Sequence, residues 1–222
     1  MIYKRHICVY ILLFVLGIAF LLPTDLMSQE SRRSKGLDDN VKAFLKNRQG
    51  AWRDFNVPAS DGKILYDLII KNKYRNALEI GTSTGHSSIY IAWALSKTGG
   101  RLITIEIDKE RYQQALANFK EAGLSDYIDA KLADAHTLVK ELQGPFDFVF
   151  CDADKEWYKN YFIDVYLKLE TGGCYTAHNV STRGWGMGTG IKDFYDYIKS
   201  LPYMRTAVDE NGSGISISYK QR

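Results

Sequence analysis

The sequence predicts an α/β fold: a mostly parallel, seven-stranded sheet with helices on both faces and a C-terminal antiparallel hairpin. Three observations lead to this prediction. From residue 74 onward, short apolar runs alternate with amphipathic segments of helical length. A glycine-rich turn, 81–85, joins the first run to a helix, and a polar turn, 209–212, joins the last two runs. Such alternation is typical of right-handed βαβ units, and the Asn-Gly turn is typical of a hairpin.

The alternation places strands at 76–80, 102–107, 127–132, 146–151, 172–177, near 204–208 and at 214–219. Helices are expected between them, at 86–97, 109–122, 135–142, 155–169 and 190–200. Two earlier helices are also expected. Asp38 or Asp39 can cap one that runs to about Arg48, and the second starts at Pro58–Asp61. Both look like covers for one edge of a ligand site.

The N-terminal segment differs in composition from the rest of the chain. Residues 4–6 are basic, and the sixteen residues 7–22 contain no charged or strongly polar side chain. This is the layout of a secretory signal peptide or of a short membrane anchor, which would contact the membrane. We expect a leader over 1–28, a polar linker over 29–36 and one domain over 37–222. The domain would be exported, periplasmic or membrane-anchored, and a cytoplasmic orientation also stays open.

Composition and cysteine use narrow the function only a little. The chain has 222 residues, 45% hydrophobic and 25% charged, which is typical of a globular protein. Its formal charge of +3 is too small to predict a nucleic-acid partner. Cys151 and Cys174 are expected in neighbouring strands but at opposite ends. We therefore expect two buried thiols rather than a disulfide.

The glycine turn indicates which ligand the sheet binds. Its pattern is Glu79-x-Gly81-x-x-x-Gly85, and Ser83 stands where a dinucleotide fingerprint has its second glycine. A carboxylate at Glu79 would repel a phosphate but would suit an ammonium group. The combination resembles the first motif of class I S-adenosylmethionine (SAM) methyltransferases, whose cofactor has no phosphate; the alternative is a turn that only joins strand to helix. The resemblance implies cofactor contacts from Glu79, Gly81, Thr82 and Ser87.

Acidic residues end the next two strands. Glu106 ends the strand at 102–107, where a carboxylate can accept hydrogen bonds from both ribose hydroxyls. Alternatively Glu106 starts the next helix, although Asp108 is the better cap. Asp134 can accept from an adenine amino group or cap the following helix, and these two roles are compatible. Ile107, Ala135 and Asp152 are assigned to the same cofactor site.

A cluster of charged residues follows the fourth and fifth strands. The fourth strand leads into Asp152-Ala-Asp154-Lys155, and the fifth ends in His178-Asn179. Adjacent parallel strands bring Asp152 beside the latter pair. Three oxygen or nitrogen ligands that converge at strand ends can hold a divalent cation. The sequence therefore predicts a metal site formed by Asp152, His178 and Asn179.

Together with Glu79-x-Gly81 and Ile105-Glu106, the pattern Asp152-Ala-Asp154-Lys155-x-x-Tyr158 resembles the cation-dependent O-methyltransferases of the catechol and caffeoyl-CoA group, over about residues 40–220. The resemblance implies a Rossmann-like SAM methyltransferase fold and a homodimer. It also implies that Asp152 binds the metal and that Lys155 deprotonates the attacking hydroxyl.

The sequence departs from that family at one ligand, because the family's Asp-Asn pair reads His178-Asn179 here. Magnesium and manganese prefer oxygen ligands, whereas imidazole suits zinc, copper, iron or nickel. Three hypotheses follow: a softer metal, a weakened magnesium site, or no metal with His178 acting as a base. A histidine that merely borders the substrate pocket is the fourth.

The expected activity is SAM-dependent methylation of a hydroxyl on a small vicinal dihydroxy aromatic, assisted by a divalent metal. Lys155, Asp152 and His178 would be catalytic. Asp154, Trp157, Tyr158 and Trp185 would contact the substrate, although either tryptophan can equally pack in a core or an interface. The alternatives are a tRNA hydroxyuridine O-methyltransferase, a non-catalytic SAM-binding domain, and an NAD-dependent dehydrogenase. Ser83 and the terminal hairpin disfavour the last of these.

Overall fold

The computed structural model describes residues 22–53, 55–183 and 187–221. The chain divides into two units, 1–40 and 41–222, and the second contains the whole sheet. Residues 1–21, with most of the predicted leader, lie outside the described part, so the leader stays a prediction. In the described ranges, no helix combines the length and apolar character needed to cross a membrane.

The first described element is the long helix α2, Leu22–Asn47. It continues through residues 29–36, which we expected to form a linker, so the cap predicted at Asp38 or Asp39 is wrong. A polar segment without proline can extend a helix, and the single Gly36 inside it costs only about 1 kcal/mol. Val41 and Phe44, near the end of α2, are buried in the second unit.

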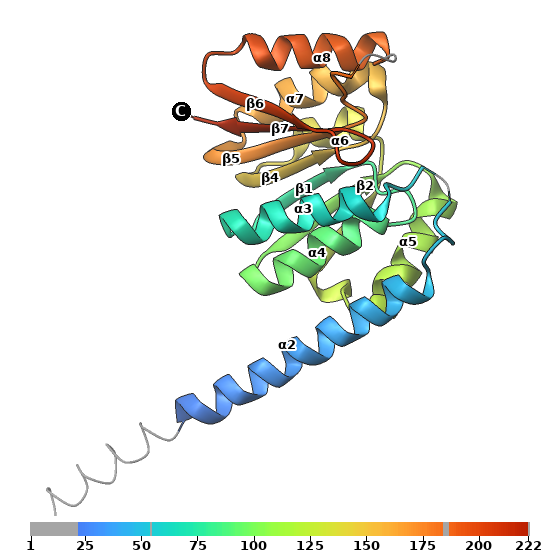
Figure 1. The fold of residues 1–222 in the computed structure, drawn as a ribbon, viewed down its shortest axis with the longest axis vertical. Coiled ribbons are helices and arrows are strands. Elements are labelled where there is room, and N and C mark those ends of the chain that lie inside the picture. The colour runs from blue at the N-terminus through green and yellow to red at the C-terminus, as the bar shows by residue number, and fades with distance from the viewer. Residues whose placement is uncertain (1–21, 54, 184–186, 222) are drawn as a thin grey trace, which may run out of the picture. The chain divides into compact units, whose positions relative to one another are not determined.

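The sheet has the predicted architecture (Figure 1). Its strands are β1 (Asn76–Ile80), β2 (Arg101–Glu106), β3 (Ile128–Leu132), β4 (Phe146–Cys151), β5 (Leu169–His178), β6 (Met204–Asp209) and β7 (Ile215–Lys220). They lie in the order β3-β2-β1-β4-β5-β7-β6. The pairs among β1 to β5 are parallel, whereas β7 is antiparallel to both β5 and β6. This confirms the Rossmann-like fold class.

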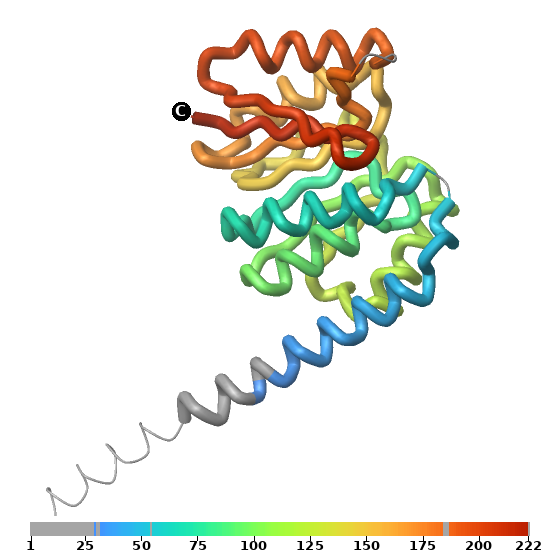
Figure 2. The backbone as a smooth tube through the Cα atoms, viewed as in Figure 1, coloured from blue at the N-terminus to red at the C-terminus, as the bar shows by residue number. Residues whose placement is uncertain are grey.

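Helices cover both faces of the sheet. They are α3 (Ala59–Asn72), α4 (His86–Thr98), α5 (Lys109–Ala122), α6 (Ala135–Glu141), α7 (Tyr158–Tyr166) and α8 (Thr189–Ser200), with short 3-10 turns η1 (Ser125–Tyr127) and η2 (Lys155–Trp157). Val149 and Cys151 pack with residues of α6, α7 and α8, while Phe148 and Phe150 pack with α3 and α4. Because side chains alternate along a strand, β4 separates two cores. The backbone in Figure 2 shows β6 and β7 completing the sheet beside β5.

The boundary between α7 and β5 differs from the prediction. We expected one helix over 155–169, but α7 ends at Tyr166 and β5 already begins at Leu169. Leu169 pairs with Phe146 on β4 and is buried in the core below α7. Tertiary packing therefore overrides the apolar helical pattern at this point.

The two described cysteines are free and buried, as predicted. Phe148, rather than Cys151, lies opposite Cys174 in the register of β4 and β5. The two thiols also belong to different cores, since Cys151 faces α7 and Cys174 faces α3 and α4. Their positions exclude a disulfide between them.

Candidate functional site

A cavity of about 640 Å³ lies at the carboxyl edge of the parallel strands, where ligands bind in open α/β sheets. It lies wholly within the second unit. Most of the predicted site residues line it: Gly81, Thr82, Ser87, Glu106, Ile107, Asp134, Ala135, Asp152, Asp154, Lys155, His178 and Asn179. Glu79, Trp157 and Tyr158 do not line it, and Trp185 lies outside the described residues.

The glycine turn after β1 brings its backbone against the end of β4. Gly81 has φ +98°, and a Cβ there would lie 2.6 Å from the carbonyl oxygen of Asp152. The N–H groups of Gly81 and Thr82 both donate to the carbonyl of Ile105, each at 3.1 Å. Only glycine combines this positive φ with this close approach. The turn therefore fixes the distance between the β1 side of the cavity and Asp152.

Glu79 lies behind this turn rather than in the cavity. It is fully buried, and its Oε2 atom accepts hydrogen bonds from Ser88 and, at 2.5 Å, from Thr104 Oγ1. Among the described residues, its Oε1 atom has no hydrogen-bond partner. Burial raises the pKa of Glu79 to about 7, despite the hydrogen bonds that favour the carboxylate. As placed here, Glu79 ties β1 to β2 and α4; its contact with a cofactor stays a prediction.

Glu106 is held in place by backbone donors. It accepts from the N–H of Ser83 at 2.7 Å, of Ile107 at 3.1 Å and of Asp108 at 2.9 Å. A carboxylate has about four acceptor positions, so this set leaves room for a ligand hydroxyl. Asp108 caps α5 through the N–H groups of Glu110 and Arg111, so Glu106 is not the cap.

Asp134 caps α6, as predicted, and accepts from the N–H of His136 at 2.9 Å. The His136 ring also connects the two acidic sides of the cavity wall. Its Nδ1 lies 3.0 Å from Asp134 Oδ1, and its Nε2 lies 3.4 Å from Asp154 Oδ2. It stacks on Tyr161, with ring centroids 5.7 Å apart, and meets the edge of Trp157 at 4.5 Å. Trp157 therefore supports the wall from behind His136.

The sequence prediction missed His136 and Tyr161, which both line the cavity. It also missed the segment before α3. Phe55 is 82% exposed at the cavity, and the Arg111 guanidinium lies 5.1 Å from its ring centroid. A large exposed aromatic residue in a connecting segment is the signal that could have found Phe55.

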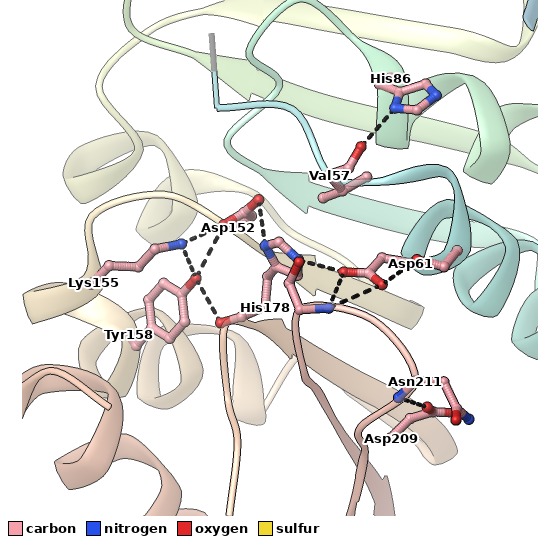
Figure 3. Close-up of polar contacts among 11 residues, drawn as sticks. Val57, Asp61, His86, Asp152, Lys155, Tyr158, His178, Asp209 and Asn211 are labelled. Carbon is pink, nitrogen blue, oxygen red and sulfur yellow. Dashed lines mark hydrogen bonds and ion pairs between the residues drawn. The ribbon is translucent and has the colours of Figure 1, made fainter. Parts of the chain in front are cut away.

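Both carboxylate oxygens of Asp152 have cationic or polar partners (Figure 3). Oδ1 accepts from Lys155 Nζ, and Oδ2 lies 3.1 Å from His178 Nδ1. Lys155 Nζ also donates to the Tyr158 hydroxyl at 2.7 Å. Burial raises the pKa of Tyr158 well above its ordinary value, so its hydroxyl keeps its proton. Tyr158 does not line the cavity itself, and its hydroxyl holds the Lys155 amine that does.

The second nitrogen of His178 faces a carboxylate that the sequence prediction did not include. Nε2 lies 2.8 Å from Asp61 Oδ2, on the first turn of α3, and Asp61 is fully buried. Asp61 also accepts from the Ser213 N–H at 3.0 Å. Figure 3 shows Asp61 and Lys155 on opposite sides of the pair that His178 forms with Asp152.

The charges in this chain stabilise one another. Burial disfavours a charged His178, but its hydrogen bonds to Asp152 and Asp61 and their negative charges outweigh burial and raise its pKa to about 9. Burial would likewise raise the pKa of Asp61, yet the hydrogen bonds from His178 and Ser213 bring it below its ordinary value. His178 is therefore an imidazolium at neutral pH, with an ionised Asp61.

This donor set does not fit a divalent cation. The structure brings the predicted ligands Asp152 and His178 together, but as an ion pair in which both ring nitrogens and both carboxylate oxygens are already engaged. Asn179 is exposed and has φ +59°. Across the described part of the chain, no three His, Cys, Asp or Glu side chains are grouped so that they could hold a metal ion.

The comparisons with known proteins agree on one family. A sequence model of the O-methyltransferase family matches residues 27–189. Caffeoyl-CoA O-methyltransferase 1 of Eucalyptus globulus is 32% identical over 138 residues, covering 60% of this chain and 56% of the relative. Catechol O-methyltransferase of Niastella koreensis is 38% identical over 133 residues, covering 58% and 60%. The chain thus spans less than two thirds of these relatives.

Two solved structures extend the likeness to most of the chain. The O-methyltransferase from Bacillus cereus in complex with SAH has a TM-score of 0.72 and 26% identity, covering 91% of this chain and 94% of its own. TomG from Streptomyces achromogenes, in complex with SAM, has a TM-score of 0.67 and 27% identity, covering 82% and 88%. The chain belongs to the class I SAM-dependent O-methyltransferase family of the caffeoyl-CoA and catechol enzymes.

Proposed function

We propose that this protein transfers the methyl group of SAM to a hydroxyl of a small, catechol-like aromatic acceptor. One observation carries the proposal: a single cavity joins the acidic strand ends at Glu106 and Asp134 to the Lys155–Asp152 pair. The first part suits a nucleoside, and the second suits a hydroxyl that must lose its proton. The complexes of the Bacillus and Streptomyces relatives with SAH and SAM support the choice of cofactor.

The residues present fit this cofactor. Glu106 has free acceptor positions for ribose hydroxyls, and Ile107, 67% exposed at the cavity, offers an apolar surface to an adenine ring beside Asp134. The turn at Gly81 and Ser87 would hold the methionine part. The negative charge of Asp152 and Asp154 in the cavity wall suits a sulfonium. When bound, SAM supplies an electrophilic methyl carbon.

The protein's part in the reaction is alignment and proton removal. A free phenol has a pKa of about 10 and is a poor nucleophile at neutral pH. In the proposed step, the acceptor oxygen bonds to the methyl carbon as the carbon–sulfur bond breaks, and SAH leaves. The phenol proton passes to the unprotonated amine of Lys155. Asp152 and the Tyr158 hydroxyl, which already contact Nζ, hold the resulting ammonium.

The test replaces the base and keeps the site otherwise intact. Lys155→Met should abolish methyl transfer from labelled SAM to 3,4-dihydroxybenzoate while calorimetry still shows SAM binding. Lys159→Met is the matched control, because Lys159 pairs with Asp193 at 3.1 Å and does not line the cavity. Full activity in Lys155→Met would contradict the proposed base. Turnover by the unaltered chain would exclude a non-catalytic SAM-binding role.

The proposal includes two features outside the cavity. A homodimer is the assembly that the family resemblance implies, and light scattering of the purified chain tests it. Residues 1–28 would place the domain outside the cytosol or anchor it at a membrane, which cell fractionation tests. A small aromatic hydroxyl compound, rather than a nucleic acid, would be the partner, since the net charge of +3 provides little attraction for a phosphate backbone.

A further inference from the structure

Asp61 is a buried carboxylate beside the site that the proposed transfer step leaves without a role. It comes from α3, and it reaches the strand ends only through His178. A buried charge of this kind is costly unless it is paired and hydrogen-bonded. Asp61 has both kinds of partner, since it accepts from His178 and from the backbone N–H of Ser213.

The position of Asp61 is fixed by the turn between β6 and β7. A Cβ on Gly212 would lie 1.5 Å from Asp61 Oδ1, so the backbone of this turn passes directly over the carboxylate. Ser60 Oγ also donates to Asp61 Oδ1 at 3.1 Å. The carboxylate is thus held from α3 and from the hairpin, which leaves Oδ2 directed at the imidazole.

The two nitrogens of His178 both face carboxylate oxygens, at 2.8 Å to Asp61 and 3.1 Å to Asp152. A carboxylate only accepts hydrogen bonds, so each nitrogen must donate, and a ring with hydrogen on both nitrogens is positively charged. Lys155 Nζ donates to the other oxygen of Asp152. The imidazolium is therefore held between two carboxylates, and neither of its nitrogens is free to bind a metal.

We propose that the chain Asp61–His178–Asp152 uses up the groups that a divalent cation would need in this site, so that methyl transfer requires no metal. Asp61 is the positioning residue that holds His178 against Asp152. The inference rests on the proposed function, and it also widens the substrate class. A dication selects two adjacent hydroxyls because it binds both oxygens, whereas proton removal by Lys155 requires only one. Aromatic acceptors with a single hydroxyl should therefore be methylated as well.

A metal would have to disrupt this arrangement in order to bind. It would displace Lys155 or His178 from Asp152, and neither ring nitrogen of His178 is free to complete its ligand set. The oxygen-rich set that magnesium prefers is absent, because an imidazole stands at the end of β5.

The first test uses the unaltered full chain. Turnover of 3,4-dihydroxybenzoate and of 3-hydroxybenzoate with SAM is measured in chelator and again with magnesium, manganese or zinc restored. We expect both acceptors to be methylated in chelator and calorimetry to detect no binding of these metals. Turnover that appears only with a metal would overturn this inference and leave the proposed function intact. No turnover in any arm, with SAM bound, would overturn the proposed function and this inference with it.

Variants test the roles of the two residues separately. His178→Asp restores a carboxylate to the end of β5, and it should bind magnesium in calorimetry and become sensitive to chelator. Asp61→Asn should lower kcat on the order of 10²-fold, the cost of a small misplacement, with KM for SAM unchanged. It should also shift the pH profile, which a purely structural residue would not do. Asp67→Asn, on the exposed face of the same helix, is the control. If Asp61→Asn matches this control, Asp61 has no positioning role.

Discussion

The Nε2 atom of His178 lies 2.8 Å from Oδ2 of Asp61, although 117 positions separate the two residues in the sequence. This contact joins α3 to the end of β5 and places a buried ion pair beside Asp152 at one end of the cavity. Because Asp152 holds the other ring nitrogen, the imidazole has a fixed orientation and charge. This arrangement, and not a set of free oxygen ligands, forms the polar end of the site.

Stability should depend on the charge of His178. Its folded pKa of about 9 lies above its ordinary value of 6.5, so its stabilising contribution is fully present below pH 6.5. The contribution is lost as the pH rises through about 9, and it amounts to a few kcal/mol. The titratable groups that face the ring are Asp61 on α3, Asp152 after β4 and, beyond it, Lys155. Urea unfolding between pH 6 and 10 should therefore show a steeper loss of stability for the unaltered chain than for His178→Gln; parallel curves would contradict this.

The turn over Asp61 offers a way to disturb the ion pair without changing any charge. Gly212→Ala places a methyl group onto Oδ1 of Asp61, so the carboxylate must move away from His178. We expect a loss of kcat comparable to that of Asp61→Asn, together with a destabilisation of roughly 1 to 3 kcal/mol from overpacking. Gly188→Ala is the control, because a Cβ at that position has no neighbour within 4 Å. Equal kinetics for the two variants would show that the position of Asp61 is unimportant.

The turn at Gly81 should tolerate no side chain. Gly81→Ala would combine an unfavourable φ of +98° with a contact of 2.6 Å to the carbonyl of Asp152. The turn would move, and SAM affinity measured by calorimetry should fall more than tenfold, which is about 1.4 kcal/mol. Gly172→Ala is the control for backbone strain alone, because Gly172 has φ +82° but a Cβ there has no neighbour within 4 Å. We expect that variant to be less stable but to bind SAM normally.

Replacing Glu106 or Glu79 by glutamine should have different effects on SAM affinity and on stability. Glu106 lines the cavity, so Glu106→Gln should weaken SAM binding by about 1.5 to 3 kcal/mol, as expected for a hydrogen bond to a charged group. Glu79 lies behind the turn and its pKa is already raised to about 7. Glu79→Gln has no carboxylate to ionise, so it should lose less stability than the unaltered chain as the pH rises through about 7. Its SAM affinity should fall less than that of Glu106→Gln. A larger loss of affinity in Glu79→Gln than in Glu106→Gln would restore Glu79 as a direct cofactor contact.

The sequence predicted the parts of this site that depend on strand order. β1, β4 and α5 have the predicted bounds, and the parallel register of β4 and β5 brings Asp152 to His178 as expected. Strong local patterns, an apolar run and a capping residue, specify these elements. The α7–β5 boundary was wrong because burial of Leu169 against β4 decided it, which no local pattern reveals.

Asp61 shows why the rest of the site could not be predicted. It looks like an acidic residue in the first turn of a covering helix, a common position for a carboxylate. Its role depends on how α3 packs beside the end of β5 and on the turn at Gly212, two contacts between segments far apart in the chain. The sequence could therefore show that His178 departs from the family, but not which residue it pairs with.

The most direct test of the central claim follows the methyl group itself. The purified chain is incubated with SAM that carries a deuterated methyl group and with 3,4-dihydroxybenzoate, and the acceptor is analysed by mass spectrometry. We predict that the label appears as a methoxy group on the aromatic ring, in equal amount to the SAH formed. SAM that stays bound and unconsumed with this acceptor and its single-hydroxyl analogues, or SAH formed without labelled acceptor, would contradict the account.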